Sequence, residues 1–261
     1  MALITVSGLT KSYGTHQVLH GIDLTVDEGE IVGVLGPNGS GKTTAVECIG
    51  GLRARDGGTV DIAGMDPATD PLALREMLGM QLQQCRLPNR MRVAEALDLY
   101  SAFYDDPRPA GELLDRFGLA AHARQPFGKL SGGQQQRLSI ALALIGRPRI
   151  AFLDELTTGL DPAARREIWE YLGLLRDEGV TMLLVTHFME EAAFLCDRVV
   201  ILEDGRIVAS GTPADIAAGT GGQETSFAAD PAIDLDALRR LPGVTSVSVD
   251  RGRVSVRGDA D

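Results

Sequence analysis

Cysteine, aromatic residues and long apolar stretches are all scarce in this sequence. The three cysteines, Cys48, Cys85 and Cys196, are odd in number and lack the spacing of metal ligands, so we expect small buried side chains in a reducing compartment. No apolar run approaches the roughly 20 residues that a helix needs to cross a bilayer. The opening residues 1–6 are too few for the apolar part of a signal peptide. Any role at a membrane is therefore expected to depend on a partner.

Positive charge is also in deficit, with 25 Lys and Arg residues against 36 Asp and Glu residues and a net charge of -11. Such a surface disfavours non-specific attraction to nucleic acid or to an anionic membrane, and no nucleic-acid partner is expected. A nucleotide can still bind, because its phosphates can be held locally by backbone N–H groups and by one or two cations.

Short strand-like runs alternate with helical patterns, which is typical of an α/β fold with a largely parallel sheet. Ile22, Leu24 and Val26 alternate with polar residues, as on a half-buried antiparallel strand. Continuous apolar runs predict central strands that are covered on both faces. These runs are residues 31–35, 150–153, 182–185 and 199–202.

Between residues 83 and 131 the pattern becomes helical. One apolar stripe is formed by Val93, Ala96, Leu97 and Tyr100, and after a loop at 105–111 a second helix is expected around 113–117. A break at 219–222 separates a main domain, residues 1–218, from a small extension, residues 219–261. A helix at 235–241 and strands at 244–249 and 253–257 are expected there, as parts of an incomplete accessory domain.

A glycine-rich segment between an expected strand and an expected helix fits the phosphate-binding P-loop pattern in full. Its residues are Gly36, Pro37, Asn38, Gly39, Ser40, Gly41, Lys42 and Thr43, with Thr44 directly after them. Glycines let successive N–H groups face phosphate oxygens, and the helix adds its positive end. Lys42 is expected to reach the β- and γ-phosphates and Thr43 to offer a hydroxyl to Mg²⁺. A plain glycine-rich turn is the alternative, and the strand–loop–helix context favours nucleotide binding.

Two carboxylates, Asp154 and Glu155, follow the apolar run at 150–153. A buried strand that ends in this way places them at the carboxyl edge of the sheet, where ligands of α/β proteins bind. Asp154 is the expected Mg²⁺ partner and Glu155 the expected base for an attacking water. An acidic turn that merely closes the strand is the alternative, and the P-loop upstream favours the catalytic interpretation.

The segment at residues 130–137 starts with Leu130 and reads like a helix start, with Ser131 as N-cap and Gln134 three residues later. Its remaining residues are Gly132, Gly133, Gln135, Gln136 and Arg137. The whole run resembles the signature segment of ABC ATPases. A capped helix start with two glycines is itself an anion site, so capping and phosphate recognition are compatible. In that family the signature faces the γ-phosphate held by another copy.

The rest of the chain, from about residue 3 to 218, is similar to the same family. The resemblance implies that Tyr13 stacks on adenine, that Asp161 belongs to the D-loop (residues 159–162) and that His187 is the switch histidine at the γ-phosphate. It also implies a Q-loop glutamine near the Mg²⁺ or water, assigned to Gln83, with Gln84 and Gln81 as rival choices. Leu156 stands where most relatives have proline, so it restores an N–H and loosens the backbone before the D-loop.

The resemblance implies a P-loop NTPase fold with a mainly parallel core sheet. An N-terminal antiparallel β subdomain, a helical signature subdomain at about 84–145 and a short α+β C-terminal extension complete it. The implied function is the ATPase subunit of an ABC transporter, with ATP and Mg²⁺ as cofactors. The chain most resembles prokaryotic exporter subunits of the multidrug- or antibiotic-resistance type. The implied partners are a second copy, or a paralogous subunit, in a head-to-tail dimer and an integral membrane permease, at the cytoplasmic face of the membrane.

Two other classes of ATPase share these motifs. Chromosome-maintenance or repair ATPases insert long coiled-coil heptads between the P-loop and the signature, and this sequence has none. Ribosome-associated factors usually carry two cassettes and a basic linker, whereas this chain has one cassette and a net negative charge. Both contrasts favour the transporter subunit. Co-purification with a membrane protein rather than with ribosomes separates these alternatives.

Overall fold

The computed structural model describes residues 2–81, 87–219, 223–228, 235–239, 241, 244–250 and 253–258. They form two compact units, Met1–Ser210 and Gly211–Asp261. The first unit combines a parallel core sheet, an antiparallel sheet and a group of helices. This is the α/β fold class that the sequence predicts.

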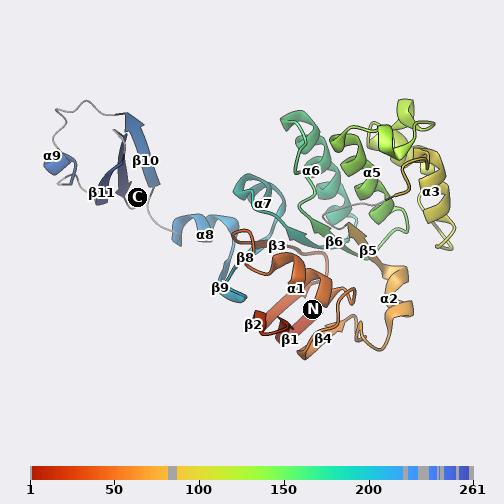
Figure 1. Cartoon of the computed structure of the whole chain (residues 1–261), viewed down its shortest axis with the longest axis horizontal. Coiled ribbons are helices and arrows are strands. Elements are labelled where there is room, and N and C mark those ends of the chain that lie inside the picture. Colours follow the sequence, from red (N-terminus) through yellow and green to blue (C-terminus); the bar gives the residue numbers. More distant parts are fainter. Residues whose placement is uncertain are drawn as a thin grey trace. The chain divides into compact units, whose positions relative to one another are not determined.

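In the described residues the core sheet has six strands in the order β5-β6-β7-β3-β8-β9. Strands β5, β6, β3, β8 and β9 are labelled in Figure 1. Their bounds are β5 (Leu78–Gln81), β6 (Ile150–Asp154), β7 (Thr181–Val185), β3 (Ile31–Leu35), β8 (Arg198–Glu203) and β9 (Arg206–Gly211). The pairs from β5 through to β8 are parallel. Every residue of β3, β6 and β7 is buried, as their continuous apolar runs predict.

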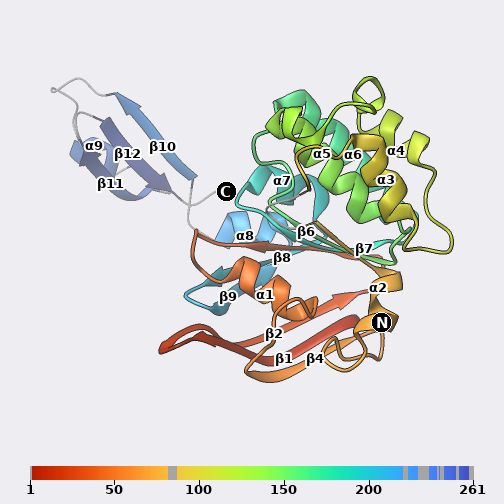
Figure 2. The ribbon, with the colours of Figure 1, turned by 45° about the vertical axis from the view of Figure 1, so that its right-hand side comes forward.

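A second, antiparallel sheet has the order β2-β1-β4. Its strands are β1 (Ala2–Tyr13), β2 (His16–Asp27) and β4 (Gly57–Ile62). Ile22, Leu24 and Val26 are buried, so the alternation along β2 correctly identifies its inner face. Helix α1 (Lys42–Ile49) contacts β1, β2 and β7, and it therefore lies between the two sheets (Figure 2). One hydrophobic core joins both sheets through this helix.

The signature helix belongs to a group of helices beside the β5–β6 edge of the core sheet. Helix α5 (Gly132–Leu144) contacts both strands, and α3 (Val93–Ser101) contacts α5 and α4 (Ala110–Arg116). Val93, Ala96 and Leu97 are buried on α3, as the apolar stripe predicts, and Tyr100 is half-buried. The other helical elements of this unit are α2 (Pro71–Met77), η1 (Ala120–His122), η2 (Phe127–Lys129), α6 (Pro162–Asp177) and α7 (Met189–Leu195).

The second unit begins with α8 (Pro213–Gly219) and continues into a small sheet of order β10-β12-β11. The strands are β10 (Gln223–Ala228), β11 (Val244–Asp250) and β12 (Arg253–Gly258), and α9 (Leu235–Arg239) contacts β11. The α+β character of the extension is thus confirmed. Strand β10 is present in addition to the helix and the two strands that the sequence predicts. Across the described part of the chain, no helix combines the length and the apolar character needed to cross a membrane.

Candidate nucleotide-binding and catalytic site

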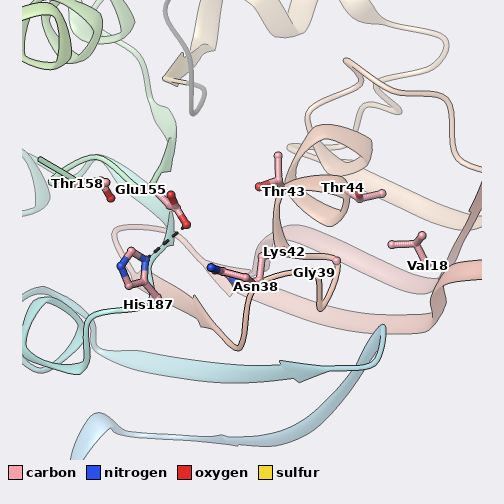
Figure 3. A pocket seen from close by; sticks show the side chains of 10 residues that line it. Val18, Asn38, Gly39, Lys42, Thr43, Thr44, Glu155, Thr158 and His187 are labelled. Atoms are coloured by element: carbon pink, nitrogen blue, oxygen red, sulfur yellow. Dashed lines mark ion pairs between the residues drawn. The ribbon is translucent and has the colours of Figure 1, made fainter. Parts of the chain in front are cut away.

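Loops at the carboxyl ends of β3, β6 and β7 open onto one pocket of about 470 Å³. Because these strands are parallel neighbours, the loops that follow them meet at the same edge of the sheet. The pocket is lined by Val18, Asn38, Gly39, Gly41, Lys42, Thr43, Thr44, Glu155, Thr158 and His187 (Figure 3).

The P-loop connects β3 to α1 and requires glycine at two positions for steric reasons. A Cβ on Gly36 would lie 2.0 Å from the carbonyl oxygen of Leu202, and Gly41, the residue before α1, has a left-handed φ of 102°. The Lys42 ammonium donates hydrogen bonds of 2.8 Å to the carbonyl oxygens of Gly36 and Pro37. Burial lowers the pKa of Lys42, and the carboxylates of Glu155 and Asp154 oppose that shift. The Lys42 ammonium is therefore held against the backbone of the P-loop, at the N-terminus of α1.

Asp154, the last residue of β6, and Thr43 of α1 bring two oxygen-bearing side chains together. The Thr43 hydroxyl donates to Asp154 Oδ2 at 2.8 Å. Asp154 is only 1% exposed, and its second oxygen, Oδ1, has no hydrogen-bond partner within the described residues. A buried carboxylate oxygen without a partner, beside a hydroxyl, fits the hard oxygen chemistry of Mg²⁺.

The protein offers Mg²⁺ only part of a coordination shell. The described stretches contain no group of three or more His, Cys, Asp or Glu side chains that could hold a metal ion. Mg²⁺ commonly completes its octahedron with water and with phosphate oxygens of a nucleotide. The Thr43–Asp154 pair therefore suits a metal ion that arrives together with a triphosphate.

Replacing Asp154 with asparagine is expected to stabilise the chain at neutral pH in the absence of nucleotide and metal. Burial raises the pKa of the Asp154 carboxyl, against the opposing hydrogen bond from Thr43. The folded state thus holds the proton more tightly than the unfolded chain, and stability is lost as pH rises through the folded pKa. Asparagine carries no charge, and its oxygen can still accept from Thr43.

Thermal melts of the Asp154→Asn variant and the wild type, from neutral to mildly acidic pH, measure this effect. The higher midpoint of the variant is expected to be clearest at neutral pH. The difference is expected to shrink as pH falls and Asp154 becomes protonated in the folded state. A variant that melts below the wild type at neutral pH contradicts the prediction.

Glu155 and His187 lie next to each other on one side of the pocket, where their side chains form an ion pair (Figure 3). His187 Nδ1 lies 3.5 Å from Glu155 Oε1, and the Glu155 side chain is mostly buried. The Glu155 backbone donates to the Val185 carbonyl at 2.9 Å, which ties it to the end of β7. Its φ of 49° lies in the left-handed region, which a residue with a Cβ adopts only when its surroundings enforce it. Specific contacts therefore hold Glu155 in an unfavourable backbone conformation at this point.

The signature segment begins a helix in the predicted way. Ser131 Oγ accepts from the Gln134 backbone at 3.3 Å, and Gln134 Oε1 accepts from the Ser131 backbone at 2.9 Å. This reciprocal pair is a capping box. Ser131 and Gly132 are exposed and are not lining residues of the pocket. Further along α5, the Gln136 amide donates to the carbonyl oxygen of Leu156 at 2.9 Å.

Comparison with known proteins decides the family. A sequence model described as "ABC transporter" matches residues 19–158, which include the P-loop, the signature segment and Asp154 with Glu155. The chain belongs to the ABC transporter family. Its role in that family is the ATP-binding subunit, an ATPase.

Three relatives illustrate this membership. The daunorubicin resistance ATP-binding protein DrrA3 of Streptomyces coeruleorubidus is 38% identical over 96% of this chain and 81% of its own length. The Nod factor export ATP-binding protein I of Rhizobium sp. (strain N33) is 40% identical over 80% of this chain and 71% of its own length. A dimeric, post-hydrolysis structure of the ATP-binding cassette MJ0796 with ADP and Pi superposes with a TM-score of 0.74, at 30% identity over 80% of this chain and 98% of that one.

Most of the site residues that the sequence predicts line the pocket or adjoin it. Asn38, Gly39, Gly41, Lys42, Thr43, Thr44, Glu155 and His187 are lining residues, and Asp154 contacts the pocket through Thr43. Gly36, Pro37 and Ser40 belong to the same loop without being lining residues. Asp161 caps α6 by accepting from the Ala164 backbone at 3.0 Å. Gln83 and its rival Gln84 lie outside the described residues, and Gln81 is buried at the end of β5.

The lining of the pocket differs from the predicted set of residues at Tyr13, Val18 and Thr158. Tyr13 is 43% exposed and not a lining residue of the pocket, and the Arg53 guanidinium lies 5.3 Å from its ring centroid. Val18 and Thr158 do line the pocket. Val18 belongs to no motif, so the sequence carries no signal for it. Thr158 could have been inferred from its position between Glu155 and the D-loop.

Proposed function

We propose that two copies of this chain, or one copy and a paralogous ATPase subunit, close head-to-tail on two ATP molecules. Each copy supplies its P-loop to one site and its signature segment (Ser131, Gly132, Gly133 and Gln134) to the other. The observation that carries this proposal is the separation of Ser131 from the pocket of its own chain, with its capped helix end exposed. Exposed N–H groups at a helix start suit a phosphate presented by a second molecule.

Within each site, the γ-phosphate is approached by residues from several loops. Lys42 exchanges its carbonyl partners for β- and γ-phosphate oxygens. Thr43 and Asp154 would hold Mg²⁺, which would neutralise phosphate charge when bound. Glu155 takes a proton from a water whose oxygen bonds to the γ-phosphorus as the bond to ADP breaks. His187 contacts the γ-phosphate beside Glu155, and Gln83 is assigned to the Mg²⁺ and water. Tyr13 is assigned to the adenine, and Asp161 to the interface between copies.

We further propose that hydrolysis by this chain powers export through a separate membrane permease, with the chain peripheral at the cytoplasmic face. The names of two relatives, a daunorubicin resistance ATP-binding protein and a Nod factor export ATP-binding protein, support this direction. The test is co-expression with a candidate membrane permease. Co-purification and permease-dependent stimulation of ATP hydrolysis are expected. Recovery with ribosomes or DNA instead contradicts the transport role.

The Mg²⁺ assignment predicts a specific response to Thr43→Ala. Removing the hydroxyl is expected to raise the Mg²⁺ concentration needed for half-maximal ATP hydrolysis by about 10-fold or more, because one oxygen ligand is lost. Thr43→Ser keeps the hydroxyl and is expected to resemble the wild type. Titration of ATPase rate against free Mg²⁺ measures both. Equal Mg²⁺ requirements in the alanine and serine variants rule out this role for Thr43.

A further inference from the structure

A fully buried carboxylate lies outside the pocket and has no part in the chemistry proposed above. Glu191, on α7, is 0% exposed. Its Oε1 accepts from the Thr157 hydroxyl at 2.7 Å and from the Trp169 indole N–H at 2.8 Å. Its Oε2 is buried and has no hydrogen-bond partner among the described residues. Burying a carboxylate costs desolvation free energy, which the two hydrogen bonds only partly offset. A buried group of this kind is therefore a candidate for a functional role.

The two donors come from different parts of the ATPase machinery. Thr157 lies two residues after Glu155, in the loop that leads to Asp161. Trp169 lies on α6, the helix that Asp161 caps, and Glu191 itself follows His187 by four residues. One carboxylate oxygen thus ties together the loop after Glu155, α6 and the helix after His187. Two of these segments directly follow the two pocket side chains Glu155 and His187 in the chain.

Other contacts strengthen the same contact region between α6 and α7. The Arg165 guanidinium of α6 lies 4.6 Å from the centroid of the Phe188 ring, beside His187. The rings of Trp169 and Phe194 have centroids 5.4 Å apart. These contacts pack α6 and α7 directly against each other. The Glu191 side chain that binds Thr157 is therefore fixed by the packing of two helices.

The backbone conformation of Glu155 makes such support necessary. Its left-handed φ of 49° is unfavourable for a residue with a Cβ and persists only when neighbouring contacts enforce it. The Val185 carbonyl restrains the Glu155 N–H, and Gln136 restrains the carbonyl of Leu156. The Thr157 hydroxyl is the next restraint along the loop, and Glu191 is the group that receives it.

We propose that Glu191 is a positioning residue, which holds Glu155 at its distance from His187 through the Thr157 hydroxyl. The inference rests on the proposed function of Glu155 as the base. Glu191 touches neither nucleotide nor water, and its effect is on the geometry of the loop. A shift of about 1 Å in a catalytic group is enough to slow a reaction by up to about 100-fold.

The first test is steady-state ATP hydrolysis by the full chain with Thr157→Val and Glu191→Leu. Valine has nearly the shape of threonine and removes only the hydroxyl. Each variant is expected to lower kcat by about 10-fold or more with the ATP KM changed by less than about twofold, because the P-loop is untouched. The double variant is expected to be no slower than the slower single variant, because both changes remove the same bond. Glu190→Leu, at the exposed neighbouring position on α7, is the matched control.

A second readout uses Trp169, the sole tryptophan of the chain. Its indole N–H bonds to Glu191, so its emission is expected to shift in Glu191→Leu and to stay at the wild-type position in Thr157→Val. Glu191→Gln keeps an acceptor oxygen and is expected to restore most of the kcat lost in Glu191→Leu. Slow hydrolysis by Thr157→Val with wild-type emission places the effect on the loop rather than on the α6–α7 packing.

Three outcomes overturn the proposal: kcat within about twofold of wild type in both Thr157→Val and Glu191→Leu, additive losses in the double variant, or no rescue by glutamine. If Glu191→Leu does not fold, Thr157→Val decides alone. The same experiments distinguish this inference from the proposed function. Normal ATP hydrolysis by Glu155→Gln overturns the proposed function. Normal hydrolysis by Thr157→Val, together with an inactive Glu155→Gln, overturns only the role of Glu191.

Discussion

Glu155→Gln is expected to lower kcat for ATP hydrolysis by about 10²–10⁴-fold while ATP binding stays close to wild type. The glutamine amide has nearly the size of the carboxylate but cannot take a proton from water. Lys42, Thr43 and the glycines of the P-loop, which we propose hold the phosphates, are unchanged. Phosphate release measures kcat, and equilibrium binding of labelled ATP measures affinity.

The matched control for this variant is Glu190→Gln, which makes the same chemical change at an exposed carboxylate of α7. It is expected to hydrolyse ATP at the wild-type rate. Glu155 lies 3.5 Å from His187 in the pocket, so the substitution removes the proposed base beside the proposed γ-phosphate site. Turnover by Glu155→Gln within a few-fold of wild type excludes Glu155 as that base.

Gly132→Asp is expected to abolish hydrolysis without destabilising the chain. Gly132 is the first residue of α5 and is exposed, and a Cβ built on it meets nothing within 4 Å. An aspartate in the first turn of a helix interacts favourably with the helix dipole, by about 0.3–1 kcal/mol. In the proposed dimer the same carboxylate faces the γ-phosphate held by the other copy. Repulsion there and loss of the anion site are expected to lower kcat by at least about 100-fold.

The measurements for Gly132→Asp are thermal melting, ATP binding and ATP hydrolysis on one preparation. Melting and ATP binding are expected to match or exceed those of the wild type, because the pocket lies elsewhere in the same chain. Gly132→Ala is the control, since it adds a Cβ in open space without charge, and it is expected to retain most of the hydrolysis. If Gly132→Asp hydrolyses ATP as fast as Gly132→Ala, the signature does not face a phosphate.

The fold and the central part of the site could be predicted because local chemistry determines them. The buried strands β3, β6 and β7 are continuous apolar runs, and the P-loop needs glycines wherever its backbone turns or approaches Leu202. The capping box of Ser131 and Gln134 is likewise a short-range pattern. Parallel strand order then brings the P-loop, Asp154 and His187 together, since all three follow strands at the same edge.

The remaining features depend on contacts between residues far apart in sequence. Glu191 looks like an ordinary helix carboxylate until the fold buries it against Thr157 and Trp169. Val18 lines the pocket only because β2 passes beside the P-loop. Strand β10 contains few apolar residues, and it is recognisable only by its pairing with β12. In each case the deciding information is tertiary packing, which periodicity does not carry.

The central claim is that ATP joins two copies through the P-loop of one and the signature of the other. The most direct measurement is the mass in solution, by sedimentation, of Glu155→Gln with and without ATP and Mg²⁺. A monomer without nucleotide and a dimer with ATP are expected. The double variant Glu155→Gln with Gly132→Asp is expected to bind ATP and remain monomeric. A monomeric Glu155→Gln chain saturated with ATP, or a double variant that dimerises equally well, contradicts the account.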